Sequence, residues 1–260
     1  VPEHLIEYVT AVSGGTPYCF QDYLCYLHQN HLIFIGYPLV DYPEKRSQVY
    51  SAVCERFDPQ TITLVTADMA GLPQGNETQP ADRYYRLKLP LTSLDPAVAY
   101  MVRRAEKELK VEVGQFGREH KKIIKDFIRR QDLSAAQIHI FKNVSTYMRR
   151  STSAYLLEAR KSGRLVAFSI VDLGSARYAF YQFSFRSAKQ MVPGASDLLF
   201  NEMVRLAQSE GKQAINLGLG ISAGIRRFKE KWGGKAFLDH RAVIIERKST
   251  PDISQLSKKL

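Results

Sequence analysis

The residues best suited to chemistry lie in a short basic helix near the end of the chain. Ile225, Phe228 and Trp232 follow one another at i, i+3 and i+7, which predicts the buried stripe of a helix over 223–232. Lys229 falls at the margin of this stripe, where a partly buried cation can reach a cleft. The alternative is a solvated lysine on a surface helix. The spacing alone leaves both interpretations open.

Two arginines and a glycine-rich turn accompany this lysine. Arg226 and Arg227 are weaker candidates for binding a phosphate or a carboxylate. The turn before the helix contains Gly218 and Gly220 and is a second candidate anion site. It fits no dinucleotide motif, because the third glycine, Gly224, comes one residue too late, and no Gly-Lys-Ser/Thr follows as in a P-loop.

The second half of the chain supplies elements that could position these groups. Tight turns at Ser162-Gly163 and Gly174-Ser175 separate apolar runs that predict an antiparallel hairpin. Gly211 then marks the end of a helix. The predicted elements are a helix over 147–161, strands at 165–172 and 178–185, a helix over 196–209, a strand at 214–217, the helix over 223–232 and a strand at 241–247.

The first half of the chain reads as a small mixed unit. Its periodicity indicates a helix over 19–29, a strand at 31–37, a helix over 47–57, and strands at 61–66 and 84–89. Two prolines flank the stretch 91–96, which is the best candidate for a domain boundary. Two helices, near 97–110 and 118–131, are expected after it.

Four segments carry a resemblance to a known superfamily. They are GIRRFKEKWGG at 224–234, INLG at 215–218, YLLEAR at 155–160 and VRRAEK at 102–107. Together they resemble the acyl-CoA N-acyltransferase (GNAT) superfamily. The closer likeness is to its branch of Fem-type aminoacyl transferases and lysylphosphatidylglycerol synthase C-terminal domains.

The resemblance implies an α/β fold with a half-open mixed sheet, in tandem with an incomplete or divergent N-terminal copy. The expected domains are a GNAT-like or partial α/β domain at 1–95 and a GNAT-like transferase domain at 96–260. Within the second, 97–131 resembles the basic helices that link the tandem folds. The resemblance also implies a bacterial source.

The implied activity is N-acyl transfer, which passes through an oxyanion that needs N–H donors or a cation. By resemblance, Lys229 stabilises charge on the transferred acyl group, and Tyr181 is a candidate acid. The donor is expected against the strand at 178–185 and the start of the helix over 196–209, whose N–H groups would hold phosphate. The expected donor-binding residues are Ser184, Phe185, Gln190, Gly194, Ala195 and Ser196.

The phosphate-binding loop departs from the superfamily pattern. Pro193 stands where the middle glycine belongs, and Asp197 places negative charge in the first helical turn, where it opposes a bound phosphate. The alternative is that Pro193-Gly194 only shapes a turn and Ser196 caps the helix. Acetyl-CoA or another acyl-CoA therefore stands beside an aminoacyl-tRNA as the expected donor.

No general base and no metal site stand out. Asp172 and Glu158 are candidate bases, although many members of the superfamily let water or the substrate take the proton. The six histidines show no metal-ligand spacing, so no metal is predicted.

The charge is unevenly distributed. Residues 1–100 carry a net charge of −5, whereas 101–150 hold 13 Lys and Arg against 6 Asp and Glu, and the last 160 residues carry +16. Such a reversal indicates an anionic partner, such as a phosphorylated cofactor, a nucleic acid or an acidic lipid surface. Arg103 and Arg104 are candidate anion-binding residues, and RNA contact through 101–150 is expected. The alternative is a solvated helical face.

Composition places the chain among soluble globular proteins. Of its 260 residues 45% are hydrophobic and 24% charged, and no apolar run approaches the roughly 18 residues of a membrane span. Its three cysteines, without a Cys-x-x-Cys pair, predict reduced thiols in a cytoplasmic protein.

The leading hypothesis is an N-acyltransferase that moves an acyl or aminoacyl group from an acyl-CoA or an aminoacyl-tRNA to an amine acceptor. The basic segment 101–150 favours the tRNA donor, because Lys and Arg contacts to phosphates supply nucleic-acid affinity. The alternative is a non-catalytic module with the same fold that binds RNA or an acidic lipid surface.

Overall fold

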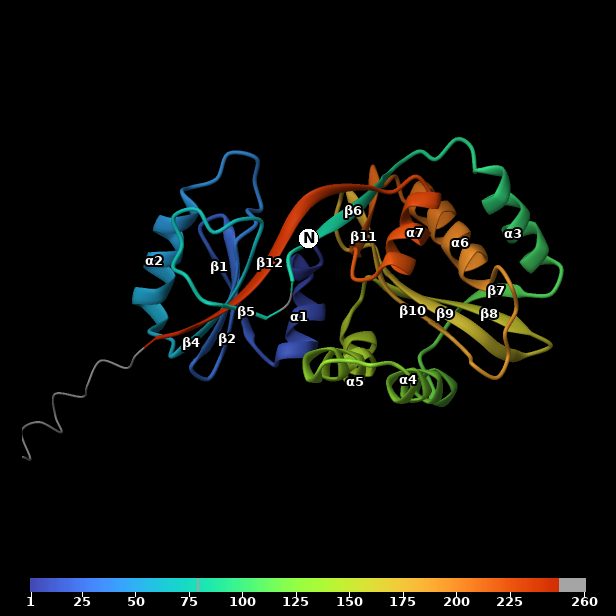
Figure 1. Cartoon of the computed structure of the whole chain (residues 1–260), viewed down its shortest axis with the longest axis horizontal. Helices are drawn as coiled ribbons and strands as arrows, with labels where there is room; N and C mark the ends of the chain where they lie inside the picture. Colours follow the sequence, from blue (N-terminus) through green and yellow to red (C-terminus); the bar gives the residue numbers. More distant parts are fainter. Residues whose placement is uncertain (79, 248–260) are drawn as a thin grey trace, which may run out of the picture. The chain divides into compact units, whose positions relative to one another are not determined.

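The computed structural model divides into two compact units, coloured along the chain in Figure 1. The structure describes residues 1–78 and 80–247. The larger unit comprises Val1–Val12 and Arg83–Leu238, and the smaller unit comprises Ser13–Asp82 and Asp239–Leu260, of which 79 and 248–260 lie outside the described residues. In the described part of the chain, no helix is long and apolar enough to cross a membrane.

A mixed sheet forms the centre of the larger unit. Its strands lie in the order β6-β11-β10-β9-β8-β7, and all neighbours are antiparallel except the parallel pair β10 and β11. The strands are β6 (Asp82–Lys88), β7 (Lys110–Gly114), β8 (Ala154–Lys161), β9 (Arg164–Asp172), β10 (Tyr178–Arg186) and β11 (Ala214–Leu219).

Two pairs of helices bury the two faces of this sheet. One apolar core contains side chains of α3 (Pro96–Glu106) and α6 (Ala195–Ser209), and the other contains side chains of α4 (Arg118–Arg130) and α5 (Ala135–Arg150). Strand β10 contributes Ala179 to the first core and Phe185 to the second. These residues are six apart and would share a face in a regular strand, so the bulge between Tyr181 and Phe183 shifts the alternation of side chains. The remaining helices of the unit are η1 (Pro2–His4), α1 (Ile6–Ser13) and α7 (Ala223–Lys231).

Capping residues fix where the helices of the larger unit begin. Asp95 accepts hydrogen bonds from the first turn of α3, where Pro96 supplies a preset φ at the first helical position. Ser134 and Gln137 form a reciprocal capping box on α5. Ser222 caps α7 through the backbone N–H of Ile225. These bonds satisfy N–H groups that lack an intrahelical partner.

The smaller unit has its own sheet and core. Its strands lie in the order β1-β2-β3-β4-β12, with β5 also paired to β12. Helix α2 packs on this sheet through Val49 and Val53, which lie in one core with Phe34 and Leu64. The elements are β1 (Thr16–Phe20), β2 (Tyr23–His28), β3 (His31–Ile35), α2 (Arg46–Phe57), β4 (Thr61–Thr66), β5 (Asn76–Glu77) and the part of β12 (Lys235–Glu246) that begins at Asp239.

The two units repeat one arrangement of strands. In the smaller unit, β1, β2 and β3 pair antiparallel in sequence, and α2 then connects β3 to the parallel strand β4. In the larger unit, β8, β9 and β10 pair in the same way, and α6 connects β10 to the parallel strand β11. The sequence shows no internal repeat, so the tandem arrangement becomes visible only in the strand order.

Two helices expected from the sequence are wrong. The segment 19–29 forms parts of β1 and β2, which meet at a turn where Gln21 has φ +50°. The segment 147–161 divides into the end of α5 and the strand β8. Helix-forming residues in 155–160 adopt a strand because β8 pairs with β7 on one side and β9 on the other, and such pairing overrides local propensity. Most of α5, and β7 entirely, were not expected.

The other expected elements of 31–66 and 165–247 are present, as are the helices near 97–110 and 118–131, now α3 and α4. The expected domains at 1–95 and 96–260 stay a prediction. The two compact units divide the chain at other residues, and 248–260 lie outside the described part.

Candidate functional site

The parallel strands β10 and β11 separate part of the way along their length. They pair only from Tyr178 with Ala214 to Phe180 with Asn216. Beyond Phe180, β10 continues to Arg186 beside β9, with a bulge between Tyr181 and Phe183. We call this region, 181–186 of β10 and 217–219 of β11, the strand divergence.

The equivalent strands of the smaller unit do not separate. There β3 and β4 pair at five successive positions, from His31 with Thr61 to Ile35 with Val65. In the larger unit, β10 pairs with β11 at only three positions, and the rest of that edge of β10 is not paired with β11. An extended ligand could pair with backbone groups there in the manner of an added strand. The larger unit therefore carries the candidate site.

Lys229 of α7 lies at the strand divergence and is buried, with 4% of its surface exposed. Its Nζ donates a hydrogen bond of 2.5 Å to the carbonyl oxygen of Leu219, at the end of β11, and lies 5.6 Å from the centre of the Tyr85 ring. A buried ammonium group carries a large desolvation penalty, and its field is weakly screened. The solvated-lysine interpretation is wrong, and the catalytic role of Lys229 stays a prediction.

Tyr181 of β10 faces the neighbouring residue of α7. Its ring is stacked on Phe228, with ring centres 6.2 Å apart, and meets the edge of Phe200 of α6 at 5.2 Å. Burial raises the pKa of the Tyr181 phenol, and hydrogen bonding to Ser184 and Ser169 offsets this only in part. Tyr181 therefore keeps its proton at neutral pH and can act as a donor. Tyr181 therefore packs against the residue that directly precedes Lys229 in α7, which links the positions of the two predicted catalytic residues.

Asp197 ties the end of α7 to the start of α6, a role that the sequence did not reveal. Its Oδ1 accepts a hydrogen bond of 3.0 Å from Trp232 Nε1 and lies 2.6 Å from Lys231 Nζ. The Trp232 ring packs on Phe200 with ring centres 4.7 Å apart. Because Lys229 lies within one helical turn of Trp232, this anchor also fixes the position of the lysine.

The start of α6, where a phosphate was expected, is covered by α3. A Cβ added to Gly194 would lie 2.3 Å from the backbone oxygen of Met101, and Ala195 is only 2% exposed. The carboxylate of Asp197 is already buried in the first turn. A pyrophosphate at this helix end would have to displace α3 and meet a negative charge.

The other predicted donor-binding residues lie in different surroundings. Phe185 belongs to the core under α4 and α5, where its ring meets Phe127 at 5.3 Å. Ser184 is partly buried, and its Oγ accepts a hydrogen bond of 3.2 Å from Ser169. Gln190 and Ser196 are also partly buried, and Gln190 lines a pocket beside α4. The donor-binding set stays a prediction.

The four predicted anion-binding arginines are all exposed, in two separate helices. Arg103 and Arg104 lie in the last turn of α3, whereas Arg226 and Arg227 lie in α7 beside Lys229. None of the four forms an ion pair within residues 1–78 and 80–247. Only the second pair is close in sequence to the strand divergence.

Both candidate general bases are buried, and their oxygens are already bound. Asp172 accepts hydrogen bonds from Ser153 Oγ, the backbone N–H of Gly174 and the hydroxyl of Tyr147. The oxygens of Glu158 lie beside the buried His120 and the half-buried Arg160, with Oε1 3.0 Å from His120 Nε2 and Oε2 2.6 Å from Arg160 Nε. These carboxylates stabilise the fold, and no residue in the described part stands out as the base.

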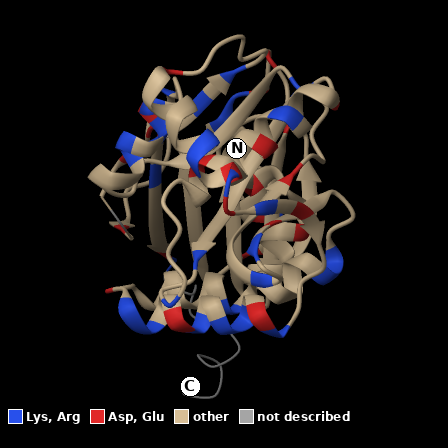
Figure 2. Cartoon of the chain, turned by 90° about the vertical axis from the view of Figure 1, so that its right-hand side faces the viewer, with Lys and Arg blue, Asp and Glu red and all other residues tan. Residues whose placement is uncertain are grey.

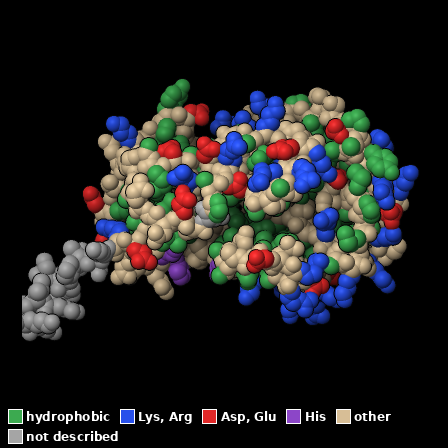
Figure 3. Space-filling view, in the orientation of Figure 1, with side chains coloured by type: hydrophobic (Ala, Val, Ile, Leu, Met, Phe, Trp, Pro, Cys, Tyr) green, Lys and Arg blue, Asp and Glu red, His purple; other side chains and the backbone are tan. Residues whose placement is uncertain are grey.

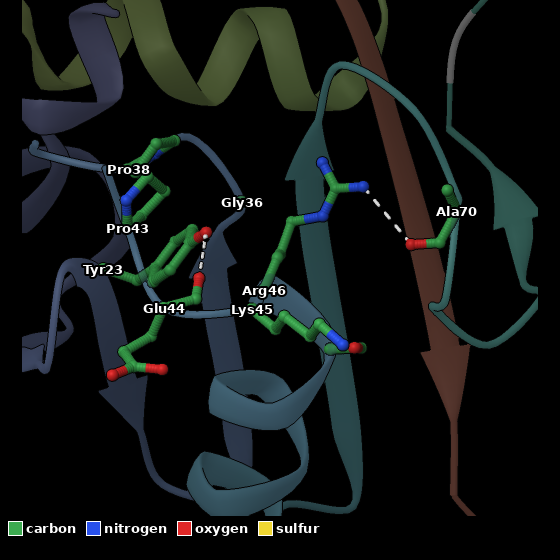
Figure 4. Close-up of a pocket in the computed structure, with 9 residues that line it drawn as sticks. Tyr23, Gly36, Pro38, Pro43, Glu44, Lys45, Arg46 and Ala70 are labelled. Carbon is green, nitrogen blue, oxygen red and sulfur yellow. Dashed lines mark hydrogen bonds between the residues drawn. The ribbon is translucent and has the colours of Figure 1, made fainter. Parts of the chain in front are cut away.

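A second hollow lies in the smaller unit, between the end of β3 and the start of α2 (Figure 4). It occupies about 440 Å³, and Arg46 lines it. The guanidinium group of Arg46 is already bound to Asp68 at 2.5 Å and to Thr66 Oγ1 at 2.9 Å. Tyr23 donates to the carbonyl of Glu44. Of the two cations in its lining, Arg46 is neutralised by Asp68 and Lys45 is exposed to solvent, so this hollow is a weaker candidate than the strand divergence.

Comparisons with solved structures identify the fold. The C-terminal domain of a proposed lysylphosphatidylglycerol synthetase from Agrobacterium fabrum matches with a TM-score of 0.60 and 14% identity, over 97% of this chain and 90% of that one. FemX matches with a TM-score of 0.54 and 11% identity, over 84% and 83%. A tandem GNAT protein from the clavulanic acid biosynthesis pathway matches with a TM-score of 0.53 and 13% identity, over 88% and 79%.

These likenesses show the fold alone, because every identity is low. No protein-family model matches the chain, and no curated protein matches it by sequence. The protein has the Fem-like, tandem fold of the GNAT superfamily. The resemblance expected from 102–107, 155–160, 215–218 and 224–234 is thereby confirmed at the level of fold.

Proposed function

We propose that the protein is an N-acyltransferase that moves an aminoacyl group from an aminoacyl-tRNA to an amine acceptor. The observation that carries this proposal is the buried Lys229 at the strand divergence of a GNAT fold. The start of α6, where the pyrophosphate of an acyl-CoA was expected to bind, is covered by α3 and holds the carboxylate of Asp197. This favours an aminoacyl-tRNA, whose leaving group would not need to bind at that helix end. An acyl-CoA donor is the competing outcome.

The proposed reaction exchanges an ester for an amide. The acceptor nitrogen forms a bond to the ester carbonyl carbon, and negative charge develops on the carbonyl oxygen, where the Lys229 ammonium group stabilises it. The ester C–O bond then breaks. Tyr181, whose raised pKa keeps it protonated, gives its proton to the leaving ribose oxygen. The proton released by the amine restores Tyr181 through water.

The test compares Lys229→Met, which keeps the apolar stem, with Lys229→Arg, which keeps the charge. Transfer is measured from bulk aminoacylated tRNA to a panel of amine acceptors, with acetyl-CoA as a parallel donor. We expect kcat to fall by about 10²- to 10³-fold in Lys229→Met, in line with the loss of one oxyanion-stabilising group, and partial recovery in Lys229→Arg.

The proposal fails in three recognisable ways. If the wild-type protein transfers from acetyl-CoA and not from aminoacyl-tRNA, the assignment of the donor is wrong. If Lys229→Met folds with a normal melting temperature and transfers at the wild-type rate, the site is wrong. If the wild type turns over neither donor with any amine of the panel, the alternative of a non-catalytic binding module takes its place.

A further inference from the structure

Helix α4 carries a row of cations on its outer side. Five exposed residues, which we call the α4 stripe, lie within one half of the helix surface at about 100° per residue: Arg118, Lys121, Lys122, Lys125 and Arg129. The stripe extends over roughly 16 Å at a rise of about 1.5 Å per residue. Lys and Arg side chains gather at the lower edge of the larger unit, over α4 and α5, in the space-filling view (Figure 3), and the ribbon carries many Lys and Arg positions along the same edge (Figure 2).

The charge of the stripe is largely uncompensated. Arg129 pairs with Asp126, and in the described part of the chain the other four residues form no ion pair. Glu119, which lies beside the stripe, is bound to Arg160 at 2.9 Å. Four neighbouring positive charges repel one another, and this destabilises the isolated fold slightly. Such a surface produces a strong positive potential that attracts an anionic partner.

A pocket extends the stripe towards the strand divergence. It occupies about 270 Å³ and shares Lys122 with the stripe, and Arg164 and Lys189 add two more exposed cations. Glu119 also lines the pocket, and its charge is paired with Arg160. Gln190, also in its lining, belongs to the loop that follows β10. A polyanion bound along α4 would therefore reach the end of the strand that carries Tyr181.

The geometry distinguishes among anionic partners. A helix that lies in a lipid surface turns its apolar face outward, whereas Ile123 and Ile124 of α4 are buried in the core beneath it. A free phosphate or a single coenzyme would occupy one end of the stripe. A row of cations this long matches the repeated phosphates of a nucleic-acid backbone.

We propose that the α4 stripe and its pocket bind the phosphate backbone of RNA. This inference rests on the proposed function for the identity of the RNA, which is then the tRNA part of the donor. Binding is through phosphates and independent of base sequence, because none of the large hydrophobic residues exposed in the described part lies on α4 to stack on bases.

The test is the salt dependence of tRNA binding. The variant Lys121→Gln/Lys122→Gln/Lys125→Gln removes three charges from the stripe. The matched control, Lys88→Gln/Lys107→Gln/Lys235→Gln, removes three charges from exposed lysines outside α4. Each lost phosphate contact lowers the slope of log K against log salt by about 0.7 to 0.9. We expect the stripe variant to lose about two units of slope and the control to retain the wild-type slope.

Three results of the binding test would overturn the inference. The two variants could lose the same slope, which would mean that net charge alone matters. The stripe variant could bind tRNA like the wild type. Wild-type protein could bind vesicles of phosphatidylglycerol and not tRNA, which would make the surface a lipid-binding one.

The binding test is independent of catalysis. Lys229→Met should bind tRNA with the wild-type affinity and slope while losing transfer. If the stripe variant loses salt slope in tRNA binding and the control does not, but the wild type transfers no aminoacyl group, the proposed RNA-binding surface is supported and the proposed function is wrong. If the stripe variant transfers from aminoacyl-tRNA with an unchanged KM, the function stands and the surface fails.

Discussion

At the scale of single residues, Lys229 shows how far a local pattern extends. The sequence places it at the margin of an apolar stripe, which is equally typical of a surface lysine. Its burial is produced by residues of other elements, namely the carbonyl of Leu219 in β11 and the ring of Tyr85 in β6. The spacing of residues within α7 cannot reveal contacts with β6 and β11. The sequence could therefore suggest a catalytic role for Lys229 but could not predict that its side chain is buried.

His120 is a second residue whose role depends on distant partners. Its Nδ1 accepts a hydrogen bond of 3.0 Å from the backbone N–H of Gly117, so Nε2 carries the proton and faces Glu158. This arrangement requires a neutral ring. Burial lowers the pKa of His120, and the neighbouring Glu158 carboxylate offsets this only in part.

The lowered pKa predicts a loss of stability in mild acid. Below pH 6.5 the unfolded chain binds a proton at this histidine while the folded protein does not, so the free energy of unfolding falls as the pH falls. We expect chemical denaturation to show a lower free energy at pH 5.5 than at pH 7.5, and His120→Gln to reduce that difference. A parallel decline in both proteins would show that His120 does not contribute.

At the scale of elements, the contact between α3 and α6 decides what the start of α6 can bind. Gly194 has φ +82°, and the backbone of Met101 leaves no room for a Cβ beside it. The sequence identified this glycine as part of a phosphate-binding loop. It could not show that α3 returns to cover the loop, because the two segments lie about ninety residues apart.

Two glycines provide a matched test of this contact. Gly194→Ala would bring its Cβ within 2.3 Å of Met101 O, whereas Gly211, with φ +67°, has nothing within 4 Å of an added Cβ. We expect Gly211→Ala to lower the free energy of unfolding by about 1–2 kcal/mol through its backbone conformation alone. Gly194→Ala should lower it by clearly more, as measured by denaturant unfolding. Equal losses would mean that α3 does not press on α6.

The elements that local patterns predicted correctly are those whose environment agrees with their propensity. The hairpin of β9 and β10 forms from two apolar runs on either side of a short turn, and β9 is buried at every position after Arg164. Helix α6 ends at Ser209, two residues before Gly211. The segment 155–160 failed because strand pairing on both sides outweighed good helix formers. Where neighbours decide the conformation, a single sequence gives the wrong answer.

At the scale of the whole molecule, two copies of one strand order have different strand contacts. β3 and β4 stay paired for five positions, whereas β10 and β11 separate after three. The copies share a topology that no repeat in the sequence reveals, because the same pairing can be built from unrelated apolar residues. The fold class could be predicted from four motifs in the larger unit, but the smaller unit carries none of them.

This difference predicts that the hollow of the smaller unit supports stability and not transfer. Arg46→Ala removes the bonds to Asp68 and Thr66, and the arginine also holds the pKa of Asp68 below its usual range. Because hydrogen bonds to charged groups contribute about 1.5–3 kcal/mol, we expect a lower melting temperature. Below that temperature, kcat/KM for transfer should stay within about twofold of the wild type, because the candidate site lies in the larger unit. A tenfold loss of kcat/KM would correspond to about 1.4 kcal/mol of lost transition-state stabilisation. A loss of transfer as large as that in Lys229→Met, in a protein that is still folded, would move the candidate site to the smaller unit.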